Sequence, residues 1–127
     1  MNIKCINYFI LITLNKILLA IILFALANIL VWFQMNGQFL WRWFEKNPIL
    51  LSVILGTIIS YLFIYATKYM FSYFDGMLWS IKFFNFALGS IIYGLMTYYF
   101  MDEGLTPKTL ICLFLALIII SVQVFMK

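Results

Sequence analysis

Residues 17–33 read ILLAIILFALANILVWF, a run in which Asn28 is the one amide side chain. A membrane-spanning helix needs about 20 mostly apolar residues, within a range of about 17–25, and this run lies at the short end of that range. We therefore predict a first span over about residues 17–34.

The segment before this span is also apolar. Residues 5–14 either lengthen the first span into a long tilted helix or form a separate short helix in the membrane interface. The tripeptide Ala25-Leu26-Ala27 is similar to a signal-peptide cleavage site, but the apolar run continues through Phe33. We therefore expect a retained span.

The composition of the whole chain agrees with a membrane location. Of its 127 residues, 67% are hydrophobic and 9% are charged. A soluble domain has about 45–50% apolar and about 25% charged residues. The composition excludes a disordered chain and an ordinary soluble enzyme, and the length allows one domain, residues 1–127.

Further apolar segments extend the pattern to four spans. Pro48 suits a first helical turn, Lys68 closes the segment that follows it, and Thr106 is a candidate cap before Pro107. The links are short, which makes neighbouring helices antiparallel. We predict an all-α integral membrane protein with four transmembrane helices in an antiparallel bundle, the last three over about residues 48–67, 77–101 and 107–126.

The basic residues mark the borders of these spans. One side of the membrane collects Lys4, Lys16, Lys68 and Lys127, with Lys82 if it snorkels; the other collects Arg42, Lys46 and Lys108. This excess predicts that both termini face the cytoplasm from the cell (inner) membrane, although so small a difference also fits insertion in both orientations. The bilayer is the expected partner, and no basic stripe indicates nucleic acid.

The sequence offers little for catalysis or metal binding. It has no histidine, and Cys5 and Cys112 lie far apart without a ligand motif. No nucleophile–base pair or phosphate-binding loop is present, so we expect no catalytic residue, no metal, no cofactor and no enzyme activity. The four acids lie near span borders, and the lack of a mid-membrane carboxylate disfavours a proton-coupled pump.

Polar side chains inside the spans are the candidates for a substrate cavity. Lys82 lies within the third span, one turn before Asn85, and it either faces a cavity for an anionic group or anchors a helix end by pairing with Asp75. Asn28 either lines that cavity or hydrogen-bonds between helices. The candidate cavity residues are Asn28, Tyr61, Tyr65, Lys82 and Asn85.

Tyr61 and Tyr65 begin a stripe that continues every four residues through Tyr69 and Tyr73. Such a stripe offers hydroxyl groups and ring faces to a polar or cationic ligand. The alternative is that these rings form an interfacial belt and pack against neighbouring helices.

Small residues give the third span a smooth face. Gly89, Ser90 and Gly94 include the spacing that lets two helices approach closely. We predict that this face packs, either within the chain or between two copies.

The C-terminal half resembles the drug/metabolite transporter superfamily. Phe100, Glu103, Leu105 and Thr106 match its pattern of an aromatic helix end, a Glu and a Leu-Ser/Thr start. The run 117–122 is similar to its Leu-Ile-x-x-Gly-Val-like close, with Ser121 in place of Gly. The resemblance covers roughly residues 61–126.

Four spans in so short a chain also resemble the small multidrug resistance branch, whose members are half-transporters. Membership would imply a dimer with a cavity between protomers. That branch carries a Glu in its first span that binds protons and cations, whereas this chain has Asn28 and no acid there. This difference does not favour drug/proton antiport.

Two classes of function follow. The first is a small multi-pass membrane transporter or flippase-like protein that acts as a homo-oligomer, with an unknown substrate. The alternative is an accessory or structural membrane subunit of a larger complex, or a virus-encoded membrane protein, without transport activity. A holin-like pore former is a third, although the chain lacks a strongly charged tail.

Overall fold

The computed structural model describes residues 2–126, and all regular structure in this range is helical. Four of its helices are long and apolar enough to cross a membrane, which confirms the predicted all-α, four-span fold. Lys127, expected to end the last span, lies outside the described residues. The elements are α1 (Ile3–Asn36), η1 (Gly37–Phe39), α2 (Arg42–Lys46), α3 (Pro48–Tyr73), α4 (Leu78–Met101) and α5 (Pro107–Phe125).

Helix α1 is continuous over 34 residues. Residues 5–14 therefore extend the first span and do not form a separate interfacial helix. No Pro or Gly interrupts Ile3–Asn36, so the backbone has no reason to break. At about 1.5 Å per residue this helix is about 51 Å long, well beyond a hydrocarbon core of about 30 Å.

Helix α3 is longer than the predicted second span. We expected Lys68 to close it, but α3 continues to Tyr73. Lysine is a good helix former and can extend its amine toward the interface, so it marks a membrane border without ending a helix. The turn comes later, at Gly76, whose φ of +80° suits glycine.

The predicted start of the last span is confirmed. Thr106 Oγ1 accepts a hydrogen bond from the backbone N–H of Thr109 at 3.3 Å, and Pro107 occupies the first turn. The hydroxyl thereby satisfies one of the donors that a helix start leaves free.

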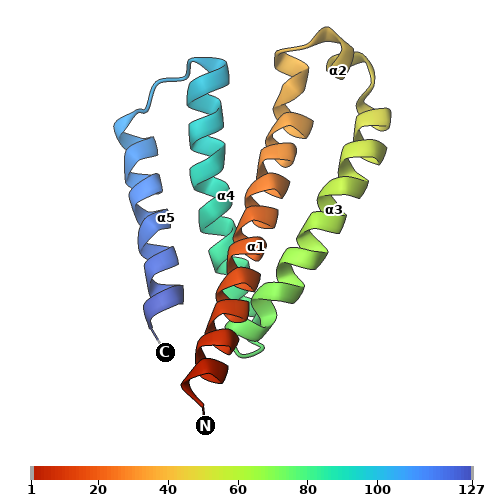
Figure 1. Cartoon of the computed structure of the whole chain (residues 1–127). Helices are drawn as coiled ribbons and strands as arrows, with labels where there is room; N and C mark the ends of the chain where they lie inside the picture. Colours follow the sequence, from red (N-terminus) through yellow and green to blue (C-terminus); the bar gives the residue numbers. More distant parts are fainter. Residues whose placement is uncertain (1, 127) are drawn as a thin grey trace.

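Consecutive long helices run antiparallel, so α1 and α4 are parallel to each other (Figure 1). Helix α1 packs against both α3 and α4, while α5 packs on the far side of α4. Both chain ends lie at one end of the bundle, and α2 lies at the other (Figure 1). Which end faces the cytoplasm stays a prediction.

The core lies near the α3–α4 turn. Ala20 and Ala66 are fully buried there beside large side chains such as Phe24 and Met70. Small residues let the helix backbones approach, which is how helices associate where lipid is as apolar as the side chains. Most of the remaining apolar side chains are exposed, as expected for a surface that contacts lipid.

Candidate functional site

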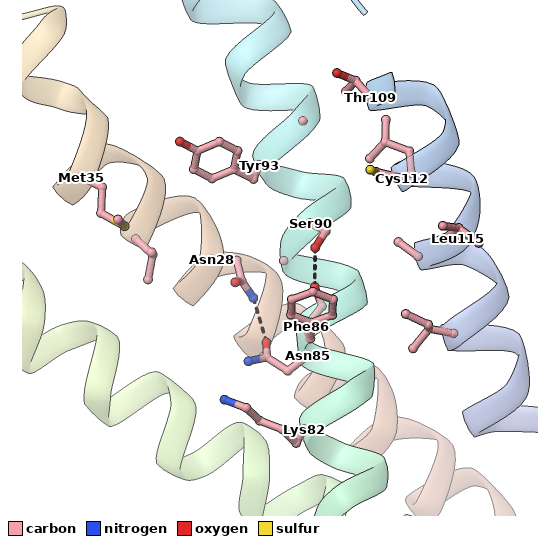
Figure 2. Close-up of a pocket in the computed structure, with 16 residues that line it drawn as sticks. Asn28, Met35, Lys82, Asn85, Phe86, Ser90, Tyr93, Thr109, Cys112 and Leu115 are labelled. Carbon is pink, nitrogen blue, oxygen red and sulfur yellow. Dashed lines mark hydrogen bonds between the residues drawn. The ribbon is translucent and has the colours of Figure 1, made fainter. Parts of the chain in front are cut away.

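Two asparagines join the parallel helices α1 and α4. Asn28 Nδ2 donates to the backbone carbonyl of Phe24 at 2.8 Å and to Asn85 Oδ1 at 2.9 Å (Figure 2). The structure therefore brings together two of the residues that the sequence singled out as cavity candidates. Their contact also places an amide pair within the apolar spans, where such side chains commonly hydrogen-bond between helices.

Two further hydrogen bonds continue this contact along the helices. Trp32 Nε1 donates to Thr97 Oγ1 at 3.0 Å, and Tyr93 Oη donates to Asn36 Oδ1 at 3.2 Å. Sequence reasoning missed all four residues. A signal existed for one of these pairs, because Asn28–Asn85 and Asn36–Tyr93 are each 57 residues apart, whereas Trp32 and Thr97 are 65 residues apart. That spacing becomes informative once α1 and α4 are known to be parallel.

The small residues of α4 serve contacts within the chain. A β-carbon at Gly94 would lie 3.2 Å from the side chain of Leu113 on α5, so this glycine admits α5. Gly89 lies against Asn28, and its lack of a side chain lets α1 approach α4 closely. Between them, Ser90 donates its hydroxyl to the carbonyl of Phe86 at 2.9 Å, a bond within its own helix.

An open groove of about 870 Å³ runs along α4 between α1 and α5. Its lining is mostly apolar, with Asn28, Lys82 and Asn85 gathered in one part. Gly89, Ser90 and Gly94 also line it, and Cys112 contributes a free thiol from α5. Three of the five candidate cavity residues therefore share one site.

The other two candidates lie elsewhere. Tyr61 and Tyr65 are neighbours on α3, with their rings tilted by 43° and the ring centroids 4.7 Å apart, and neither lines the groove. Tyr61 is 60% exposed on the outer face of the bundle. A smaller cavity of about 420 Å³, between α1 and α3, contains Lys16 and Tyr69 but neither of these two tyrosines.

The four apolar helices define a small multi-pass integral membrane protein. No protein-family model, curated protein or solved structure matches the chain. Within residues 2–126, no three His, Cys, Asp or Glu side chains lie close enough to hold a metal ion. The similarity to the drug/metabolite transporter superfamily stays a prediction.

Proposed function

We propose that the chain is a small transporter or flippase-like membrane protein whose substrate path is the groove along α4. The observation that carries this proposal is the placement of Lys82, Asn85 and Asn28 on one open groove within apolar spans. Polar and ionisable side chains are costly within a bilayer, and they mark substrate pathways far more often than lipid-facing surfaces.

The path requires a second copy of the chain. Binding pockets bury about 70–90% of a small ligand, whereas this groove is open along one side. A second protomer laid against α1 and α5 would close it, and a homodimer is the simplest symmetric arrangement. The proposed active form is therefore a homodimer with the grooves at its interface.

Cys112 is a built-in probe of this proposal. A thiol reacts with maleimide as the thiolate, which forms in water and not in lipid. In a Cys5→Ser background reconstituted into liposomes, a water-soluble maleimide should modify Cys112 at least about tenfold faster than a lipid-facing cysteine at the same depth.

The matched control is the neighbouring position Ile111, which is 61% exposed and does not line the groove. Ile111→Cys is introduced with Cys112→Ala and Cys5→Ser. In liposomes of zwitterionic lipid alone, which lack an anionic amphiphile, equally slow reaction at both positions would show that bulk lipid fills the groove and would overturn the transport proposal.

The outward position of Tyr61 favours the second candidate, an accessory membrane subunit. This side chain lies in the middle of α3 and is 60% exposed, so its hydroxyl faces hydrocarbon unless another helix covers it. Native mass spectrometry of the solubilised full chain separates the candidates. A discrete homodimer supports transport, whereas stoichiometric association with a larger complex supports the accessory role.

A further inference from the structure

The hydrogen bond from Asn28 to the Phe24 carbonyl fixes the orientation of both asparagine amides. A backbone carbonyl can accept but cannot donate, so the Asn28 atom 2.8 Å away is the amide nitrogen. The same nitrogen contacts Asn85 at 2.9 Å with its second hydrogen. The Asn85 atom in this contact must therefore be the carbonyl oxygen.

This orientation leaves the amide nitrogen of Asn85 available to the groove. Figure 2 shows that nitrogen on the same side of α4 as the amine of Lys82. The two residues are three positions apart, so they share one helix face, and both line the groove. An ammonium group and an amide nitrogen are both donors without acceptor capacity.

The local chemistry is complementary to an oxyanion. None of the acids in the described part of the chain lines the groove, so Lys82 has no carboxylate partner there. Attraction between opposite charges is stronger beside an apolar lining than in bulk water, so a bound anion would offset the cost of placing this lysine within a span. The ammonium group of Lys82 would repel a cationic ligand at this end.

The remainder of the groove suits an apolar chain. Phe86, Leu115 and Ile119 line it, and the span from Lys82 to Gly94 covers about 18 Å of helix. This length exceeds half of a hydrocarbon core of about 30 Å, which is the depth that one lipid chain occupies. The groove therefore combines a donor site at one end with an apolar track of lipid length.

We infer that the groove binds an anionic amphiphile, with its phosphate or carboxylate head at Lys82 and Asn85 and its apolar chain along α5. The inference rests on the proposed function and names its substrate class. It also assigns a role to Asn28, which is a positioning residue because it turns the Asn85 amide toward the ligand.

The test uses the purified full chain with Cys5→Ser in a non-ionic detergent, and Cys112 as the reporter. The probes are dodecyl phosphate, dodecyltrimethylammonium and inorganic phosphate. We expect dodecyl phosphate to slow maleimide modification of Cys112 and to raise the melting temperature, while the cationic amphiphile does neither. If inorganic phosphate protected Cys112 as well as dodecyl phosphate does, the inference of an amphiphilic ligand would be overturned and a free oxyanion would be identified as the ligand.

Variants separate the head-group contacts from general effects on folding. Lys82 is exposed, so Lys82→Met should keep the fold while weakening dodecyl phosphate about tenfold, as expected for lost charge-assisted hydrogen bonds. Lys82→Arg should restore binding. Asn28→Leu keeps a similar shape but removes the hydrogen bond that orients the Asn85 amide, so it should also weaken the binding of dodecyl phosphate. Lys108→Met lies outside the groove and should have no effect on binding.

The outcomes distinguish this inference from the proposed function. If both amphiphiles protected Cys112 equally, and Lys82→Met left that protection unchanged, the inference of an anionic ligand would be overturned. The proposed substrate path would survive this result, provided that Cys112 still reacted with water-soluble maleimide in liposomes. Equally slow modification of Cys112 and of Ile111→Cys in liposomes would instead overturn the substrate path itself.

Discussion

A β-carbon at Gly89 would lie 2.6 Å from the side-chain oxygen of Asn28, closer than real β-carbons approach other atoms. The contact between α1 and α4 therefore depends on a missing side chain. We expect Gly89→Ala to displace Asn28 and to lower the free energy of unfolding by about 1–3 kcal/mol, the usual cost of overpacking. Unfolding in mixed detergent micelles measures this change.

Gly104→Ala is the matched control, because nothing lies within 4 Å of a β-carbon at that position. Its stability should stay close to that of the unchanged chain. An Asn28→Ala substitution that restores the stability of Gly89→Ala would show that the clash is with this side chain. A stable Gly89→Ala single variant would contradict the packing described here.

The buried indole of Trp32 gives a second prediction. Its Nε1 donates to Thr97, and the ring is 1% exposed. Thr97→Val keeps the shape but leaves the indole N–H unpaired, so we expect a loss of about 0.6–2 kcal/mol in the same unfolding assay. Ser121→Ala, which removes a bond within one exposed helix turn, should change stability little.

A third prediction concerns topology. The link between α4 and α5 and the link between α3 and α4 lie at opposite ends of the bundle (Figure 1). In a chain without native cysteines, Gly104→Cys and Met77→Cys should therefore react with a membrane-impermeant maleimide from opposite sides. With both cysteines in one molecule, labelling of both positions of the same molecule from one side of sealed vesicles would be incompatible with four crossings.

The turn after α4 supplies a fourth prediction. Asp102 ends this helix with φ of +50°, a left-handed conformation that glycine adopts freely and β-branched residues avoid. Asp102→Val should lower stability by about 1 kcal/mol, whereas Asp102→Gly should preserve or raise it. Glu103→Val is the control, because the backbone at Glu103 is not in the left-handed conformation.

The four spans could be predicted from the sequence, because a run of about 20 apolar residues is long enough to cross a bilayer and short links make neighbouring helices antiparallel. The sequence did not determine whether residues 5–14 continue the first helix or form a separate interfacial helix, since both alternatives have the same composition. Helix α3 extends beyond the predicted second span, because Lys68 signals the membrane border and not the helix end. Helix ends depend on backbone breaks such as Gly76, which lies eight residues further on.

The candidate site was predictable residue by residue but not as a group. Asn28, Lys82 and Asn85 each stood out because polar side chains are rare in these spans, and the structure gathers them. Tyr61 and Tyr65 stood out for their four-residue spacing, yet they lie on α3 and do not line the groove. Periodicity shows that two residues share a helix face, but the neighbour of that face depends on tertiary packing.

Helix α5 is the shortest of the four long helices, with 19 residues, or about 28 Å. Helix α1, on the other side of the groove, is about 51 Å long. A bilayer adapts to a short hydrophobic segment by thinning around it. Helix α5 is only about 2 Å shorter than a hydrocarbon core of about 30 Å, so the leaflets should draw together by no more than about 2 Å beside it, where the groove opens.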